Sequence, residues 1–346
     1  MRHSCRPLLH TWVARILYAN TYMHDGKKLV LLTISVVLLL GLYSCSEGIS
    51  ELETTDKSIA SHQEPSKTSS QIQTNNNPLK QDKPGCQSIS LKFMRTGNVG
   101  NRDERGSNYA IIFNPHAKEL DFKVSLGIAH NLYAKDAKGK FRKEYIPKPF
   151  HEIINDENAQ LDGRRPIAAI NGDYIDIENK PQGLNISRGV EYSGAFKDKR
   201  SSFGISGGRP EQRRATIQKG RRKDKILNYN VAGGNGRFYQ NGKFKNICKE
   251  LGEYACYQET SRSMTAITSK GYVIWLVNNS YGEQALYPEQ FDDVLEGIAK
   301  NNCLGKIQEG MLFDGGYSTA IYFDNKIYVE NANPIGSVFL IYQKDR

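Results

Sequence analysis

The sequence predicts an α+β fold with a large mixed or antiparallel β-sheet core and few helices. Short apolar or alternating runs, most of them bounded by Gly, Asn, Asp or Pro, recur through the second part of the chain. One segment alone has a strong helical period, and no internal repeat is present. Many short strands with few helices are typical of a sheet-based core.

The expected strands lie in runs of alternating or wholly apolar residues: 109–115, 120–129, 166–175, 201–207, 263–280 and 336–344. The run 265–277 predicts a hairpin that turns at Lys270-Gly271. The run 320–330 predicts a second hairpin that turns at Asp324-Asn325.

The expected helix covers residues 288–302. Its apolar residues fall on one face at helical spacing, and they are Phe291, Val294, Leu295, Ile298 and Ala299. Pro288 suits the first turn, where acidic residues also favour the positive end of the helix dipole. A second, weaker helical pattern lies around residues 151–163.

The first 85 residues do not read as part of this fold. Residues 23–45 resemble a lipoprotein-type signal peptide, with Lys27-Lys28, an apolar run at 29–42 and Ser44-Cys45. That run is shorter than the roughly 20 residues of a membrane-spanning helix. We therefore expect export, lipidation of Cys45 and a membrane anchor, and we expect residues 1–22 to derive from an upstream start codon.

Residues 46–85 are rich in Ser, Thr, Gln, Asn, Lys and Glu, which predicts a disordered tether. The folded domain is then 86–346. The chain has a formal net charge of +10, with a basic patch at 209–225 that we interpret as a solvated loop or edge strand. Export argues against a nucleic-acid partner, whereas an anionic glycan, a phosphodiester polymer or a membrane surface suits the charge.

Four cysteines lie in the expected domain: Cys86, Cys248, Cys256 and Cys303. They allow three pairings, which the sequence leaves open. Cys248 and Cys256 could close a small loop, which would leave Cys86 with Cys303. No zinc-binding spacing is present, so we expect no metal site and no required cofactor. A divalent cation would have chemically suitable oxygen ligands, but no ligand spacing supports one.

Asp314-Gly315-Gly316 follows the apolar run Met311 to Phe313. A hairpin turn is the simplest interpretation, since Asp-Gly favours positive φ. However, a carboxylate at the end of a buried strand needs a partner or a purpose. Ser318 and Thr319 follow directly, so an active-site floor is the alternative.

Three further segments could carry chemistry. Asn171-Gly172-Asp173 also ends an apolar run, and Asn-Gly again suits a hairpin. Arg262 directly precedes a predicted strand and could clamp a phosphate or carboxylate. Gly233-Gly234 lies in a glycine-rich stretch without P-loop spacing.

Together these segments resemble the phosphodiester glycosidase family. The resemblance rests on the order of "INGDYI", "VAGGNGRFYQNGK", "SRSMTAITSKGYVIWLV", "LFDGGYSTAIY" and "NPIGSVFLIY", and the motif-bearing part is 166–342. The sequence departs from the family pattern at several positions. Thr268 stands where the family has glycine, and Asn278-Asn279-Ser280 replaces the usual acidic-glycine end of the hairpin that follows Arg262. Asp173 and Tyr317 stand where the family often has glycine.

The resemblance implies hydrolysis of a sugar-1-phosphodiester, with N-acetylglucosamine as one candidate sugar, at the glycosidic C–O bond. It implies Asp314 as the catalytic carboxylate, Asp173 as a second one and Arg262 as the phosphate clamp. Asn171 would hold a sugar hydroxyl or orient water. The implied substrate-binding set is completed by Gly172, Gly233, Gly234, Gly315, Gly316, Ser318 and Thr319.

Two other functions stay open at this point. The same groups could serve a phosphodiesterase that cuts P–O, although its usual His and Asp metal ligands are missing. A non-catalytic, surface-anchored lipoprotein could bind glycans instead, with Tyr174, Tyr317 and Tyr322 stacking on sugars.

Overall fold

The computed structural model describes residues 86–126, 133–135, 141–143, 148–156, 159–177, 179–193, 200–219, 229–251, 256–280 and 284–344. These residues all fall within one unit, Lys80–Arg346. The expected signal peptide, Cys45 and the tether lie outside them. Within the described residues, no helix is long and apolar enough to cross a membrane.

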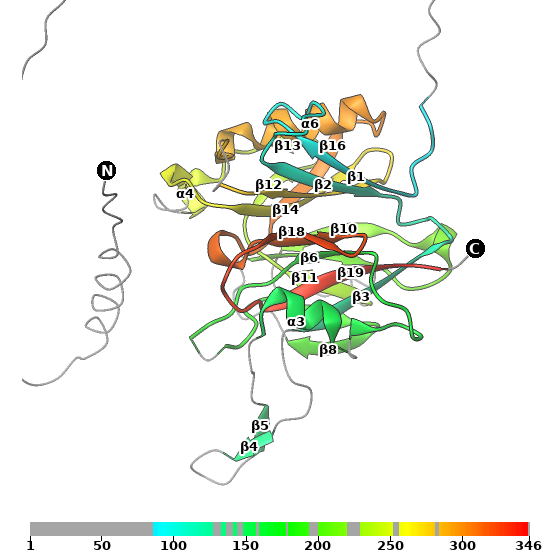
Figure 1. Ribbon diagram of the computed structural model, residues 1–346, viewed down its shortest axis with the longest axis vertical. Helices are drawn as coiled ribbons and strands as arrows, with labels where there is room; N and C mark the ends of the chain where they lie inside the picture. Colours follow the sequence, from blue (N-terminus) through cyan, green and yellow to red (C-terminus); the bar gives the residue numbers. More distant parts are fainter. Residues whose placement is uncertain are drawn as a thin grey trace, which may run out of the picture. The chain divides into compact units, whose positions relative to one another are not determined.

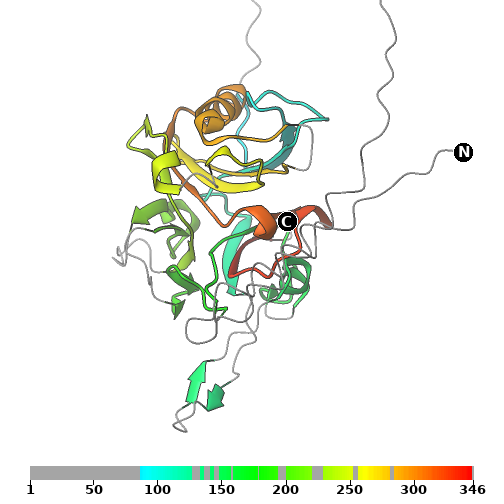
Figure 2. The ribbon, with the colours of Figure 1, turned by 90° about the vertical axis from the view of Figure 1, so that its left-hand side faces the viewer.

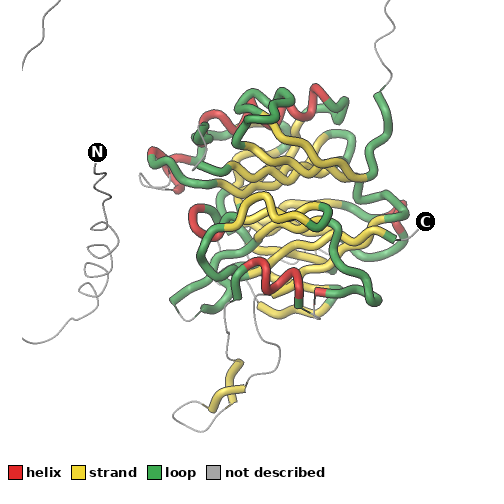
Figure 3. The backbone as a smooth tube through the Cα atoms, viewed as in Figure 1, coloured by secondary structure: helices red, strands yellow, loops and turns green. Residues whose placement is uncertain are grey.

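The strands form three large antiparallel sheets, stacked in layers with helices at their outer sides (Figure 3). The seven-stranded sheet runs in the order β1 (Leu91–Thr96), β2 (Asn108–Phe113), β15 (Val273–Asn278), β14 (Arg262–Thr268), β16 (Ile307–Leu312), β12 (Arg237–Gln240) and β13 (Lys243–Phe244). The α+β prediction is confirmed, and every strand pair in the described part of the chain is antiparallel.

The other two large sheets have five strands each. One contains β10 (Ala215–Lys219), β9 (Ser201–Ile205), β11 (Asn230–Gly233), β7 (Asn185–Ser187) and β8 (Val190–Ser193). The other contains β18 (Lys326–Glu330), β17 (Ala320–Phe323), β6 (Ala168–Asn171), β19 (Ser337–Gln343) and β3 (Leu120–Leu126). A small ribbon pairs β4 (Tyr133–Lys135) with β5 (Phe141–Lys143). The basic segment contributes β10, which is an edge strand as expected.

Both predicted hairpins are present. β14 and β15 pair around a turn in which Gly271 has φ +80°, a conformation that glycine adopts without strain. β17 and β18 pair around Asp324 and Asn325, whose φ angles are 48° and 61°. Asp and Asn tolerate this left-handed region better than other non-glycine residues, which explains why they occupy the turn.

Helix α6 (Phe291–Asn301) matches the predicted helix, and its five predicted apolar residues are all buried. Figures 1 and 2 place α6 outside the seven-stranded sheet. Helix α3 (Phe150–Asn155) is shorter than the weaker predicted helix and packs on β6, β17 and β19. The remaining helical turns are η3 (Pro210–Gln212), α4 (Cys248–Leu251), η4 (Pro288–Gln290) and η5 (Gly316–Ser318).

The main core lies between the sheets. Along β2, Ile111 and Phe113 face this central core, while Ala110 and Ile112 face α6 on the other side. Both faces of the strand are therefore buried, which explains why the sequence here is a continuous apolar run. This packing fixes the strand ends that carry the polar site residues.

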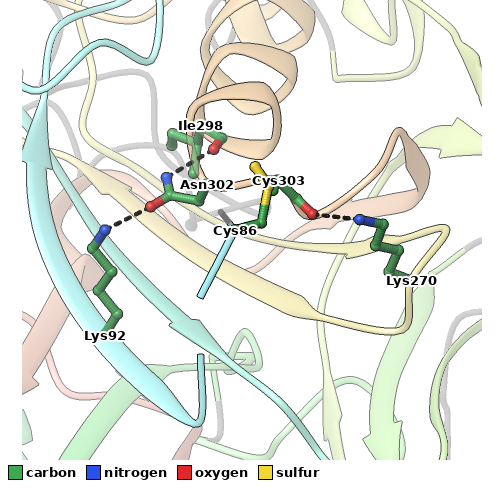
Figure 4. The surroundings of a disulfide bond; sticks show 6 residues. All are labelled: Cys86, Lys92, Lys270, Ile298, Asn302 and Cys303. Atoms are coloured by element: carbon green, nitrogen blue, oxygen red, sulfur yellow. Dashed lines mark hydrogen bonds between the residues drawn. A yellow bond between two sulfur atoms is a disulfide. The ribbon is translucent and has the colours of Figure 1, made fainter. Parts of the chain in front are cut away.

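Two disulfides join the four cysteines of the domain, Cys86 with Cys303 and Cys248 with Cys256. The structure thus selects one of the three pairings that the sequence left open. Figure 4 shows that the first disulfide lies beside the end of α6. There the Lys270 ammonium donates to the Cys303 carbonyl over 2.9 Å, and Lys92 Nζ lies 2.7 Å from Asn302 Oδ1.

Candidate active site

Asp314-Gly315-Gly316 is not a hairpin turn. Asp314 follows β16 in the seven-stranded sheet, whereas the chain after η5 enters β17 in a five-stranded sheet. Gly316 has φ +59°, and its N–H donates to the Ser261 carbonyl over 2.8 Å. The segment is therefore a crossing between two sheets.

Asn171-Gly172 is not a hairpin turn either, because β6 pairs with β17 and β19 and not with the strand that follows it in sequence. The Asp314 N–H donates to the Gly172 carbonyl over 2.8 Å. The two polar strand ends thus meet directly, one from each sheet.

A cavity of two lobes opens at this junction. The smaller lobe, about 300 Å³, contains Arg262 and is called here the Arg262 lobe. The larger lobe, about 560 Å³, contains Tyr317 and is called the Tyr317 lobe. The residues that line both lobes are Tyr174, Thr260, Asp314, Gly315 and Gly316.

Asp314 therefore lies where the two lobes join. Its side chain is partly exposed, and Oδ1 accepts a 3.0 Å hydrogen bond from the Gly315 N–H. Burial raises the pKa of Asp314 to about 7, and the charge of Asp173 adds to this rise, while a hydrogen bond with Ser318 and the charge of Arg200 oppose it. A carboxyl with this pKa exchanges protons near neutral pH.

Arg262, the first residue of β14, is buried. Its Nε donates to the Leu286 carbonyl over 3.3 Å, and its Nη2 is buried without a hydrogen-bond partner. Burial also lowers its pKa from the usual value, a sign that the guanidinium has lost water. The unpaired end of the guanidinium is a donor of the kind that bonds to phosphate or carboxylate groups.

Asn171 acts as a brace beneath the crossing. Its Nδ2 donates to the Asp314 carbonyl over 2.7 Å. Its Oδ1 accepts from Ser263 Oγ at 2.7 Å and from the Ala320 N–H at 3.0 Å. The side chain is fully buried, so the structure places it under the cavity and not on its wall.

Asp173 is fully buried and does not line either lobe. Three donors surround its carboxylate: the Gly183 N–H at 2.6 Å, Asn185 Nδ2 at 2.7 Å and the Tyr174 N–H at 2.8 Å. Burial raises its pKa to about 6 in spite of these bonds. Asp173 therefore holds the backbone at Tyr174 in place from behind the cavity.

The predicted substrate-binding glycines have N–H groups that already bond within the protein. Gly172 donates to the Ser337 carbonyl, Gly233 to Asn185 Oδ1 and Gly234 to the Ser201 carbonyl. The N–H groups of Gly315 and Gly316 donate to Asp314 and Ser261. The N–H groups of these five glycines are therefore already bonded within the protein.

The first three of these glycines instead allow close packing. A Cβ on Gly233 would lie 2.6 Å from Asp173 Cγ, and one on Gly234 would lie 2.2 Å from Met311 Cε. Of the two predicted hydroxyl donors, Ser318 bonds to Asp314. Thr319 is fully buried, and its Oγ1 has no partner.

Sequence reasoning missed Arg200 and the contacts of Tyr174. The Arg200 guanidinium lies 4.3 Å from the centre of the Tyr174 ring, a cation–π contact. The Tyr174 hydroxyl donates to the Phe313 carbonyl over 3.2 Å, and Asn235 Nδ2 donates to it over 3.3 Å. Arg200 directly precedes a predicted strand, as Arg262 does, and this shared placement is the signal that could have found it.

In the described part of the chain, no three His, Cys, Asp or Glu side chains gather as they would around a metal ion. The cavity itself supplies the chemistry of its described side chains. This chemistry consists of a proton-exchanging carboxyl at the junction of two lobes and a fixed cation in one of them.

Comparison with solved structures finds chains of low identity. A hypothetical protein from Synechocystis aligns at 13% identity and TM-score 0.46, over 68% of this chain and 59% of that one. The second structure is the catalytic domain of zebrafish N-acetylglucosamine-1-phosphodiester alpha-N-acetylglucosaminidase, auto-inhibited by its pro-peptide. It aligns at 13% sequence identity and TM-score 0.42, over 75% of this chain and 89% of that one. A putative exported protein from Burkholderia pseudomallei aligns at 8% sequence identity and TM-score 0.42, over 68% of this chain and 73% of that one.

No curated protein sequence matches the chain significantly. The family model for phosphodiester glycosidase, by contrast, matches residues 164–342. This segment is just over half of the chain and contains β6, β14 and β16, whose ends form the cavity. The chain therefore belongs to the phosphodiester glycosidase family.

Proposed function

We propose that this chain hydrolyses the glycosidic C–O bond of a sugar-1-phosphodiester and releases a free sugar and a phosphomonoester. Membership of the phosphodiester glycosidase family supports the class of bond. The observation that carries the proposal is that one cavity holds both Asp314, whose pKa is about 7, and the buried Arg262. A proton-exchanging carboxyl and a phosphate clamp are the two groups that this hydrolysis needs.

Asp314 is the proposed general base. The bond between the anomeric carbon and the phosphate oxygen breaks, and the electron pair leaves with the phosphate. Water adds to the anomeric carbon, and Asp314 accepts its proton. A phosphate is already a good leaving group, so the reaction depends less on a strong general acid than hydrolysis of an ordinary glycoside does.

Arg262 is the proposed clamp for the phosphate. The guanidinium is held through Nε by the Leu286 carbonyl, which leaves the far end of the fork for an anion. A fixed cation also stabilises the charge that grows on the leaving phosphate in the transition state. We assign the Arg262 lobe to the phosphate on this basis.

Asn171 and Asp173 are proposed as positioning residues. Asn171 fixes the backbone carbonyl of Asp314. Asp173 accepts one hydrogen bond from the Tyr174 N–H and two more from Gly183 and Asn185, so it ties the Tyr174 backbone to these residues. The Asp173 charge also raises the pKa of Asp314, so it helps to keep the base near neutral pH. These contacts favour a supporting role for Asp173 over a second catalytic carboxylate.

Product analysis in ¹⁸O-labelled water tests the proposal. The segment 86–346 is supplied with phosphodiesters of N-acetylglucosamine-1-phosphate and glucose-1-phosphate. Label in the released sugar is the expected result, because water attacks carbon. Label in the phosphate would identify a phosphodiesterase, and saturable binding without turnover by wild type would identify a glycan-binding module. The matched variants are Asp314→Asn, expected to be inactive, and Asp324→Asn at the exposed β17–β18 turn, expected to be active.

We also propose that the protein is an exported lipoprotein whose membrane anchor is attached at Cys45. Two disulfides within the domain support an oxidising compartment outside the cytosol. Incorporation of radiolabelled palmitate into the full chain, abolished by Cys45→Ser, is the expected result. Equal incorporation of palmitate by the wild-type protein and by Cys45→Ser would refute Cys45 as the site of lipidation.

A further inference from the structure

The two lobes of the cavity differ in charge, which bears on the substrate of the function proposed above. The Arg262 lobe contains a buried cation. Among the described residues that line the Tyr317 lobe there is no Lys or Arg, and the acidic side chains there are Glu259 and Asp314. This holds although the chain as a whole carries a formal charge of +10.

Tyr317 is the most exposed aromatic residue in this cavity, with 59% of its surface accessible. It lies in η5, where its backbone carbonyl accepts a 3.0 Å hydrogen bond from the Asn333 N–H. The loop is therefore held by backbone contacts, and the ring is free to serve a ligand. An exposed aromatic ring on the wall of a cavity offers a flat apolar surface to a ligand.

The composition of the Tyr317 lobe suits an uncharged sugar. An aromatic ring can cover the apolar face of a sugar, while Asn179, Thr260, Ser318 and Asn333 can bond to its hydroxyls. At about 560 Å³ the lobe is also the larger of the two, and a sugar is larger than a phosphate.

We infer that Tyr317 is the platform on which the sugar stacks, and that the Tyr317 lobe selects sugars without negative charge. The anomeric carbon then lies at the junction beside Asp314, and the phosphate points into the Arg262 lobe. A uronic acid would bring a carboxylate into the lobe that Glu259 lines, and the repulsion between the two negative charges weakens its binding. Tyr317 thus becomes a specificity-determining residue at a position where the family often has glycine.

Binding of methyl glycosides tests the platform without any need for turnover. Methyl α-glucoside and methyl α-glucuronide differ only at C6, so they isolate the effect of charge. Ligand-observed NMR titrations should show glucoside binding that Tyr317→Ala weakens about ten-fold and Tyr317→Phe preserves. Tyr257→Ala is the matched control, because Tyr257 is 71% exposed and lines neither lobe.

Glu259→Gln tests the charge filter. The wild-type protein should bind the glucuronide more weakly than the glucoside, by about ten-fold at low salt. Glu259→Gln should reduce the difference in affinity between the glucoside and the glucuronide. Added salt should reduce the same difference in the wild-type protein, because Glu259 is exposed to solvent and its charge is screened. Equal binding of the two glycosides by the wild-type protein would overturn the inference, as would unchanged binding by Tyr317→Ala or binding of neither sugar.

Turnover separates this inference from the function on which it rests. If the glycosides bind as expected but no phosphodiester is cleaved, the platform stands and the proposed hydrolysis fails. If glucose-1-phosphodiesters are cleaved and Tyr317→Ala leaves KM unchanged, the hydrolysis stands and the platform fails. If the platform and the proposed hydrolysis are both correct, Tyr317→Ala should raise KM by about ten-fold and should change kcat much less.

Discussion

Replacing Asp314 with asparagine should stabilise the protein above neutral pH while it abolishes turnover. Burial raises the Asp314 pKa from 3.8 to about 7, so the native state disfavours the ionised carboxylate. Asparagine is nearly the same size and can still accept the Gly315 N–H at Oδ1. The substitution therefore removes a buried charge without removing that contact.

The magnitude follows from linkage between protonation and folding. Between pH 3.8 and about 7 the native carboxyl holds a proton that the unfolded one has lost, so wild-type stability falls as pH rises. At about 1.36 kcal/mol for each pH unit in this window, the full loss is about 4 kcal/mol. Water at the mouth of the cavity screens the carboxylate, so about 4 kcal/mol is an upper limit.

Urea unfolding of both proteins from pH 4 to pH 8 measures this loss. The stability of Asp314→Asn relative to wild type should grow through the window and level off above pH 7. A difference between Asp314→Asn and wild type that does not change with pH would refute the reasoning about burial. The activity assay in parallel should show a loss of at least about 100-fold for Asp314→Asn.

Three further predictions follow from the same contacts. Arg262→Lys should lower kcat/KM by about 100-fold, because an ammonium cannot replace the planar guanidinium in binding a phosphate. Steady-state kinetics measures this loss, and a loss below about three-fold would contradict the prediction. Asp173→Asn should move the pH midpoint of kcat/KM to lower pH, because the charge that raises the Asp314 pKa is gone; an unmoved pH profile would argue against that coupling. Gly233→Ala should destabilise the domain by roughly 1–3 kcal/mol, since its Cβ would lie 2.6 Å from Asp173 Cγ; an unchanged urea midpoint would show that the site relaxes freely.

Local rules predicted the parts of the fold that depend on neighbours in sequence. The helix at 288–302 and the turns at Lys270-Gly271 and Asp324-Asn325 follow from periodicity and backbone preference, and all three are present. The sheet order does not follow from such rules. β6 lies between β17 and β19, which are about 150 residues away in sequence, so its partners depend on long-range packing.

The candidate site was predictable where a polar residue lies at either end of a buried strand. Asp314 and Arg262 were found in this way, and the structure brings both to one cavity. The role of each glycine could not be predicted from the sequence in this way. A glycine in the sequence can expose an N–H or admit a close neighbour, and Gly233 and Gly234 do the second. Arg200 was missed, although it directly precedes a predicted strand as Arg262 does, and its contact with Tyr174 depends on the tertiary fold.

The Cys86–Cys303 disulfide has a mechanical consequence. β1 is the edge strand of the seven-stranded sheet and the first strand of the domain, so tension on the preceding chain would otherwise pull it away from β2. The disulfide, five residues before β1, passes such tension to Cys303 at the end of α6. A covalent bond resists loads that break a row of hydrogen bonds one at a time. Stretching from the N-terminal side should therefore leave β1 in place until the disulfide is reduced.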